Sequence, residues 1–412
     1  GASLPRDAGT QVRVSTSTYD PARGGFSGGQ TAVELSPGSP FKRRTAHLTA
    51  DAPPLQVAND LSNRLGQRFT ALNGSIGGSG ELVENKWYYN SALQLSRRTA
   101  NAASLLSVGD AALAAAGVAP DSAARLVQLL GAAGVPVTAR GVPGNAISQT
   151  ASFVTRLDHT PYTPGTYDPS TESWSVSLFA NAADDQAQAF SPVSAPTRGG
   201  RHRMLFAGGQ LDYSRYFGDL LNDTRTALST NRDRGTPYLR APGGTVLVSS
   251  ILPAGNAALT GLAFGGNGAL DYDRRSWSWE AVNETKWYVK DSPHRLKLTA
   301  ESRLDGYSQS APEDLLGAFS FQSLAALQAG EASSFSRTLD APARTGGLWS
   351  GFLAMSDYWR VTPSLQLLYG ARFEGNRYTT SLAENPEVAS AFGASPSHAP
   401  NTVHVSPRVG FT

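Results

Sequence analysis

The chain has no cysteine among its 412 residues, few charged residues and no long apolar run. Without cysteine, a disulfide-stapled domain, a cysteine-ligated metal centre and a thiol nucleophile are excluded. Only 17% of residues are charged and the net charge is +2, which excludes a strongly charged nucleic-acid binder. The most apolar stretch, residues 111–119, is too short to cross ~30 Å of hydrocarbon as a helix. Membrane helices are therefore excluded, whereas a membrane β-barrel is not, because alternating strands produce no hydropathy peak.

Apolar and polar residues alternate along several stretches, and this two-residue period predicts β-strands. The pattern is clearest at residues 295–307, where a helical period would leave no apolar stripe. One face there carries Arg295, Lys297, Thr299, Glu301, Arg303 and Asp305, and the other carries Leu296, Leu298, Ala300, Ser302 and Leu304. Such strands separate lipid from a wet interior in outer-membrane barrels, although a soluble β-sandwich shows the same alternation. Further strands are predicted at residues 87–96, 147–158, 173–180, 205–213, 219–230 and 365–374.

The connections between these strands alternate in length. Short turns are predicted at residues 83–86, 217–220, 290–293 and 361–364. Long connections rich in Gly, Pro and Ser are predicted at residues 100–145, 183–202, 232–273, 310–347 and 379–403, and only residues 158–170 depart from the scheme. All short turns then fall on one rim, which is typical of outer-membrane barrels with short periplasmic turns and long extracellular loops. Compact soluble domains seldom carry several loops of this length, which disfavours the sandwich.

Aromatic residues cluster beside the short turns, as expected of a girdle at the level of the lipid headgroups. Aromatics that cap the end of a sandwich are the alternative explanation. The residues are Trp87, Tyr88, Tyr89, Tyr216, Phe217, Trp287, Tyr288, Tyr358 and Trp359. Inside the long loops, helices are predicted at residues 111–116, 121–130 and 323–329, because a glycine follows each, and a short strand is predicted at residues 245–252.

Several segments, in order along nearly the whole chain, resemble TonB-dependent receptors of the Oar-like type. Residues 17–30 (Ser-Thr-Tyr-Asp-Pro-Ala-Arg-Gly-Gly-Phe-Ser-Gly-Gly-Gln) are similar to the end of the plug of that family, and a strand is predicted to follow at residues 31–35. Residues 36–40 (Ser-Pro-Gly-Ser-Pro) depart from the Thr-x-Ser-Gly-Thr-Asn pattern, so the junction between plug and barrel is expected to differ. Further matching segments are residues 222–225, 264–267, 283–284, 294–298, 317–324, 329–330, 356–360, 369–376, 385–386, 392–393 and 406–411.

The resemblance implies an all-β fold, a partial antiparallel transmembrane β-barrel with about 11–12 of 22 strands. Residues 1–41 would be the C-terminal part of the plug domain, and residues 42–412 the N-terminal half of the barrel. We expect the chain to be a fragment that does not insert alone as a closed barrel, since unpaired strand edges are costly in lipid. The implied partners are outer-membrane lipid, the TonB–ExbB–ExbD complex, reached through a TonB box not present in this chain, and an unknown peptide, protein, glycan or chelate substrate. Nucleic acid is not an expected partner.

Residues suited to catalysis or metal binding are not grouped in the sequence. The histidines His47, His159, His202, His294, His398 and His404 lack metal-ligand spacing, and no Gly-x-Ser-x-Gly motif occurs. The Gly-rich residues 24–29 and 77–80 open no helix, and no Gly-Lys-Ser/Thr follows residues 24–29, so neither predicts a phosphate loop or a nucleophile. We therefore predict no catalytic, cofactor-binding or metal-binding residues, no cofactor and no enzymatic activity, and we assign no substrate-binding residues.

Seven charged residues are predicted to face the interior of the barrel: Arg295, Lys297, Glu301, Arg303, Asp305, Arg372 and Glu374. Because their signs are mixed, we expect them to pair with one another or with the plug. A substrate-selecting path is the alternative.

The sequence thus predicts a TonB-dependent receptor that mediates active uptake across the bacterial outer membrane. A passive porin or adhesin-like outer-membrane barrel is the first alternative. A soluble periplasmic or secreted β-sandwich binding protein is the second.

Overall fold

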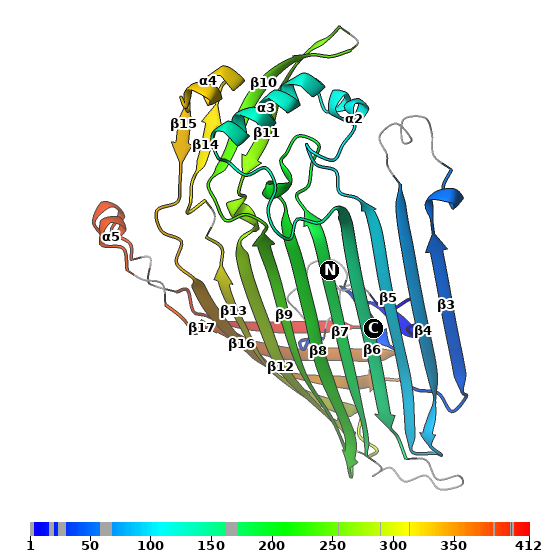
Figure 1. Cartoon of the computed structure of the whole chain (residues 1–412). Helices are drawn as coiled ribbons and strands as arrows, with labels where there is room; N and C mark the ends of the chain where they lie inside the picture. Colours follow the sequence, from blue (N-terminus) through cyan, green and yellow to red (C-terminus); the bar gives the residue numbers. More distant parts are fainter. Residues whose placement is uncertain are drawn as a thin grey trace.

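The structure is a computed structural model that describes residues 4–15, 20–23, 30–57, 68–161, 172–253, 255–288, 290–312, 314–381, 384–395, 397 and 399–412. Its main feature is a curved antiparallel sheet of twelve strands in the order β18-β17-β16-β13-β12-β9-β8-β7-β6-β5-β4-β3 (Figure 1). The strands are β3 (Arg43–Asp51), β4 (Phe69–Val83), β5 (Trp87–Asn101), β6 (Asn145–His159), β7 (Ser173–Gln188), β8 (Gly200–Phe217), β9 (Leu220–Pro237), β12 (Tyr272–Tyr288), β13 (His294–Ser310), β16 (Arg344–Thr362), β17 (Leu365–Tyr378) and β18 (Thr402–Phe411). Within this sheet each strand pairs with the one that follows it, so the sheet is a meander.

The strands form because each presents an apolar face and a polar face to different surroundings. On β13, Leu298 on one face is 44% exposed, whereas Thr299 on the other face is only 4% exposed. The face of Leu298 is the convex, outward one, and the face of Thr299 is the concave one that the N-terminal segment covers. Strands β8 and β9 have 18 residues each, more than the roughly 9–11 needed to cross a bilayer, so they extend well beyond one hydrocarbon layer. The strands predicted from the two-residue period are all confirmed.

The predicted short turns are also confirmed, and they lie together at one end of the sheet (Figure 1). One prediction about the long connections is wrong: the loop between β7 and β8 comprises only residues 189–199, because β7 continues to Gln188 and β8 begins at Gly200. The irregular connection predicted at residues 158–170 lies mostly outside the described residues. Strands β3 and β18 stand at the two edges of the sheet, so the described residues form an open wall and not a closed barrel.

Four connections fold together at the other end of the sheet into a unit that we call the cap, whereas the β17–β18 connection lies apart from it (Figure 1). It contains a four-stranded sheet in the order β11-β10-β14-β15 and three helices that flank it. Its elements are α2 (Asp110–Ala115), α3 (Pro120–Ala132), η2 (Pro196–Arg198), β10 (Gly243–Ile251), β11 (Ala257–Gly265), β14 (Ala318–Phe321), α4 (Leu324–Ala329) and β15 (Ser334–Ser336). Three further short elements lie outside the cap: η1 (Pro53–Leu55), η3 (Gly268–Leu270) and α5 (Pro386–Phe392). None of the helices in the described ranges is long and apolar enough to cross a membrane.

The cap has its own hydrophobic core, to which four connections contribute. Leu126 and Leu130 from α3 and Val246 and Leu262 from the β9–β12 connection are completely buried, and Phe321 from the β13–β16 connection packs with them. The β7–β8 connection adds a short parallel bridge to β11. Because no single connection buries its own apolar residues, the cap is stable only when these loops fold together.

The three predicted helices and the strand predicted at residues 245–252 are confirmed in the cap. Pro120 occupies the first turn of α3, and Ser323 accepts a hydrogen bond from the backbone of Ala326 to cap α4, so local sequence signals start both helices. Strands β11, β14 and β15 were not predicted. Helix α5 was also missed, although Asn385 caps it and Gly393, in a left-handed conformation, ends it.

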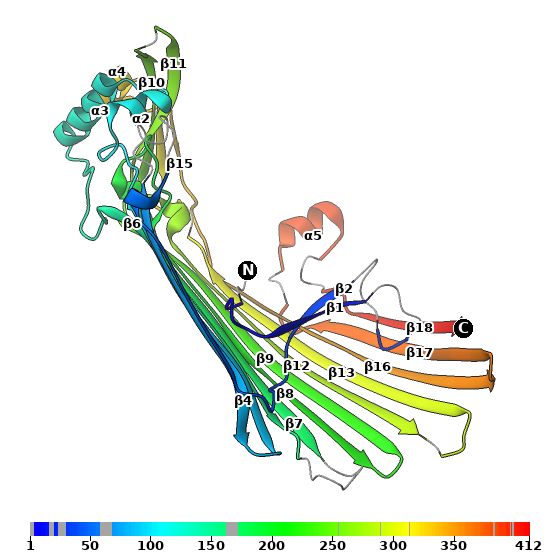
Figure 2. The same cartoon turned by 90° about the vertical axis from the view of Figure 1, so that its right-hand side faces the viewer.

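The described residues of the N-terminal segment, 4–15, 20–23 and 30–41, lie on the concave side of the large sheet (Figure 2). Its strands β1 (Thr10–Ser15) and β2 (Gln30–Leu35) pair with one another and not with the wall. The segment therefore touches the wall through turns, side chains and single backbone groups.

Candidate functional site

The concave face of the wall is polar where it meets the N-terminal segment. Strand β13 shows the arrangement: Lys297, Thr299 and Glu301 alternate with outward residues, as the two-residue period predicted. Lys297 forms an ion pair with Asp20 of the N-terminal segment, and the side chains of both residues are only 13% exposed. This contact joins residues 277 positions apart in the chain.

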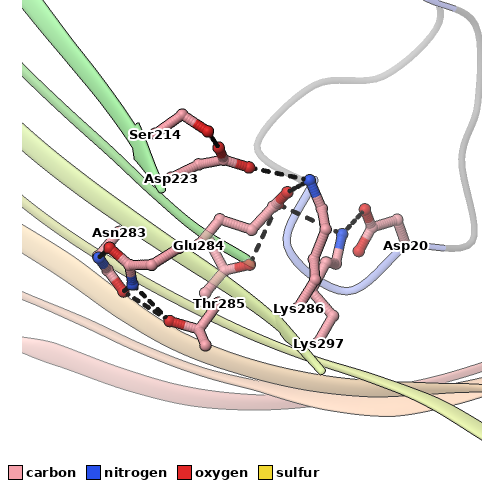
Figure 3. A network of polar contacts seen from close by, with 10 residues as sticks. Asp20, Ser214, Asp223, Asn283, Glu284, Thr285, Lys286 and Lys297 are labelled. Atoms are coloured by element: carbon pink, nitrogen blue, oxygen red, sulfur yellow. Dashed lines mark hydrogen bonds and ion pairs between the residues drawn. The ribbon is translucent and has the colours of Figure 1, made fainter. Parts of the chain in front are cut away.

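Lys297 belongs to a wider network of charges (Figure 3). Glu284 on β12 lies 3.5 Å from the Lys297 ammonium group and 2.7 Å from that of Lys286. Lys286 also lies 3.2 Å from Asp223 on β9, whose carboxylate accepts a hydrogen bond from Ser214 at 2.6 Å. The charges are thus paired across neighbouring strands, and among the described residues only the Lys297 end of this chain of contacts reaches the N-terminal segment.

Two arginines hold the same part of the segment by its backbone. Arg372 donates to the carbonyl oxygen of Ala22 at 3.2 Å, while its Nε bonds Glu374 at 2.7 Å. Arg408 on β18 donates to the carbonyl oxygen of Asp20 at 3.1 Å. These contacts clamp residues 20–22 against the far strands of the wall.

A second anchor holds residues 35–38 against β6. Arg156 donates to the carbonyl oxygen of Leu35 at 3.0 Å, and Asp158 accepts from the backbone N–H of Gly38 at 2.7 Å. Arg156 and Asp158 also bond each other at 2.7 Å, which orients both groups. Glycine is required at position 38 because a Cβ there would lie 2.5 Å from the Cβ of Tyr88.

A third anchor holds residues 6–9 against β3, β4 and β5. The Asp7 carboxylate lies 2.7 Å from His47 and is almost completely buried. The Ser75 hydroxyl does most to lower the pKa of Asp7 below its usual value, against the opposing effect of burial. Asn90 donates to the carbonyl oxygens of Gly9 at 3.3 Å and Ser36 at 2.9 Å, so this anchor joins two parts of the segment.

A polar cavity of about 670 Å³ opens between the segment and the wall. Its lining includes Arg156, Asp158, Arg225, Glu301 and Arg372. Charges of both signs line one continuous space, so the cavity suits a polar or charged solute and not an apolar one. Movement of the N-terminal segment would change the size of this cavity, because Ala22 and Arg23 form part of its lining.

The structure brings together most of the inward charges predicted from the sequence. Lys297 and Arg372 contact the N-terminal segment, Arg303 pairs with Asp305 at 2.8 Å, and Glu301 lines the cavity. Arg295 instead lies near the short-turn rim, with its guanidinium 6.0 Å from the ring of Tyr288. The expected pairing among charges and with the segment is thus confirmed.

The functional residues missed in the sequence are those whose partners are distant in the chain. Asp7 lies in no recognised segment. Asp20 and Arg408 lie in the family-like segments 17–30 and 406–411, but nothing in those segments identifies their partners, which only the fold brings into contact. Arg156 and Asp158 did leave a signal, because they occupy alternate, inward positions of a predicted strand, as the β13 charges do.

Histidines and aromatics take structural positions. His47, His202 and His294 each pair with an aspartate, and His398 lies outside the described residues. In the part of the chain that the structure describes, no group of three or more His, Cys, Asp or Glu residues is arranged to hold a metal ion. At the short-turn rim, Trp87 packs against Trp174 with the ring centroids 4.7 Å apart. Phe217 and Trp287 at the same rim are about half exposed. Tyr88 departs from the expected girdle because it faces the concave side, next to Gly38. The strand registers place three more of the predicted girdle residues on that side: Tyr216, Tyr288 and Tyr358.

Comparison with known proteins relates this geometry to solved structures. No protein-family model and no curated protein matches the sequence. The fold is similar to the outer membrane transporter YddB from Escherichia coli, with a TM-score of 0.55 and 12% identity, over 97% of this chain and 45% of that one. It also matches the ferric yersiniabactin uptake receptor FyuA from Yersinia pestis, with a TM-score of 0.43 and 8% identity, over 93% of this chain and 45% of that one.

The chain spans less than half the length of these two structures. The likeness to YddB concerns the fold, and it supports an outer-membrane location. The chain thus shares its fold with part of an outer-membrane transporter.

Proposed function

We propose that the protein is a TonB-dependent receptor of the Oar-like type that takes up a solute across the bacterial outer membrane. Residues 1–41 would be the end of the plug and residues 42–412 part of the barrel wall. The observation that carries this proposal is the N-terminal segment held inside a polar, concave wall by three sets of charged and hydrogen-bonded anchors. A soluble sandwich would fill the space between its sheets with apolar side chains.

The orientation follows from the two ends of the wall. The short turns with their exposed aromatics would lie at the periplasmic side, and the cap would lie outside the cell. The outward aliphatic residues would contact lipid. In lipid the backbone groups at the edges of β3 and β18 need partner strands, because each unpaired group costs several kcal/mol there.

Transport in this proposal needs no bond-making chemistry. The cap and the polar cavity would bind the solute, and the TonB–ExbB–ExbD complex would supply the force that moves the plug. The anchors at Asp7, Asp20 and Gly38 would have to open for the solute to pass, since they hold the segment across the interior face. The solute would be a peptide, a protein, a glycan or a chelate.

Conductance of the intact protein in a planar bilayer tests the proposal against a passive porin. We expect low conductance for the intact protein and a large increase when residues 1–41 are deleted. Equal conductance of the two forms would overturn the proposal in favour of a porin. Carbonate extraction of cell membranes tests the soluble alternative: we expect the protein in the membrane pellet, and recovery in the soluble fraction would exclude an outer-membrane transporter.

A further inference from the structure

The outward face of the wall changes character at one level near the cap. In the strand registers, the outward residues Leu95, Ala151, Ala182 and Leu205 stand opposite one another from β5 to β8. Two residues closer to the cap, the next outward level reads Arg97, Gln149, Asp184, Arg203 and Arg234 from β5 to β9. An apolar surface thus meets a charged one along a line that crosses several strands.

The charged level is strongly basic. We call its arginines, with their neighbours on the same outward face, the arginine belt: Arg97, Arg201, Arg203, Arg232, Arg234 and Arg275. Two aspartates, Asp184 and Asp273, accompany these six arginines, which leaves a surplus of four positive charges.

Each aspartate is shared between two arginines. The Oδ1 atom of Asp184 lies 2.6 Å from Nε of Arg201 and 3.8 Å from Nε of Arg203. The Oδ2 atom of Asp273 lies 2.6 Å from Nη2 of Arg232 and 3.2 Å from Nη2 of Arg275. Arg97 and Arg234 form no ion pair with any residue that the structure describes. The belt therefore has guanidinium groups available for an external anion.

A shallow hollow of about 780 Å³ lies on the outer surface at this boundary. Leu48, Leu72, Leu95 and Leu205 line its apolar part, and these side chains are about half exposed or more. Arg97, Arg203, Arg232 and Arg234 line its charged part. The hollow therefore offers aliphatic contacts on the side of the membrane wall and guanidinium groups on the side of the cap, which matches an amphiphile with an anionic head.

We propose that the arginine belt binds the phosphate groups of a phosphorylated lipid in the outer leaflet, with the acyl chains of that lipid against the leucines. Arginine suits this role because its planar guanidinium binds phosphate through two parallel hydrogen bonds. The site would hold the wall at a defined height in the membrane, just below the cap. This inference rests on the proposed orientation, in which the cap faces out of the cell.

The test measures lipid retention by the intact protein extracted from outer membranes. The protein is passed through gel filtration in detergent with bis-phosphorylated lipid A, with the same lipid stripped of its phosphates, or with inorganic phosphate as a competitor, and bound lipid is counted by native mass spectrometry. The variant R203Q/R234Q removes two belt charges. The variant R125Q/R337Q removes two exposed charges from the external loops and serves as the matched control.

We expect retention of the phosphorylated lipid, a loss of apparent affinity of about fivefold for each belt arginine and about 25-fold for the double variant, and no change in the control. Equal retention of the dephosphorylated lipid, or an equal loss in both double variants, would overturn the proposal. Displacement by inorganic phosphate at a concentration equal to that of the lipid would show an anion site and not a lipid site. A protein absent from the membrane pellet would refute the proposed function itself, whereas a membrane-inserted protein that retains no lipid would refute only this inference.

Discussion

Replacing Lys297 with methionine should release residues 20–23 from the wall. The substitution keeps most of the side-chain volume and removes the charge that pairs with Asp20. Since both side chains are only 13% exposed, the pair is largely desolvated, and breaking such a pair costs roughly 3–5 kcal/mol. We take the lower value because Arg372 and Arg408 still hold the backbone of the segment. A loss of about 3 kcal/mol makes the equilibrium constant for release from the wall about 150-fold larger than in the unsubstituted protein.

The absence of cysteine makes this release measurable. A single cysteine placed at Ala22 has no background thiol, so its rate of labelling by a maleimide in outer-membrane vesicles reports how often the segment leaves the wall. We expect K297M to raise that rate by about two orders of magnitude, provided that the segment opens and closes faster than it is labelled.

The variant K286M is the matched control. Lys286 shares Glu284 with Lys297 and also contacts Asp223, but it forms no ion pair with the described residues of the N-terminal segment. We expect K286M to change the labelling rate by less than about threefold. Equal acceleration by K286M and K297M, or no acceleration by K297M, would refute the view that the Asp20 pair holds the segment.

Three further changes test other parts of the structure. Leu126→Ala should destabilise the cap by about 3 kcal/mol, and amide hydrogen exchange should then rise in β10 and β11 as well as α3; an increase confined to α3 would show that the loops fold separately. Gly38→Ala should prevent docking of residues 35–38 and expose them to limited proteolysis, whereas Gly109→Ala, where a Cβ meets nothing within 4 Å, should not. Because the Ser75 hydroxyl lowers the pKa of Asp7, the ionised carboxylate gives its full support to docking above the ordinary aspartate pKa of about 4, and this support declines below that pH and is lost as the pH falls through the lowered pKa. Pepsin cleavage near this anchor should therefore rise only in strong acid, and D7N should abolish that dependence; an unchanged acid profile in D7N would contradict it.

The local pattern of apolar and polar residues was sufficient to predict most strands of the wall. A strand between two unlike environments must alternate, so β13 and its neighbours were visible from residue types, and turn residues located the short connections. Helices with a proline, serine or glycine at their ends, such as α3 and α4, were visible for the same local reason. Helix α5 carries equivalent signals at Asn385 and Gly393, so its ends were also predictable from the sequence, although it was not predicted.

The cap depended on contacts between distant parts of the chain. Strand β14 pairs in parallel with β10 across a separation that includes two strands of the wall, and no local period encodes that choice. Each loop of the cap carries too few apolar residues to indicate which other loop it packs against, because the hydrophobic core forms only when four connections meet.

In the candidate site, the sequence likewise predicted which face of a strand a residue occupies, and the tertiary structure decided which residue it contacts. Residue types and their alternation established that Lys297, Glu301 and Arg372 face the interior, since a side chain's face follows from its position in the strand. The identity of each partner came from the folded chain: Asp20 meets Lys297 over 277 residues, and the belt arginines align only when the strand registers are known. Charge pairing is set by distances of a few ångströms, and those distances follow from topology and register, which a linear pattern does not contain.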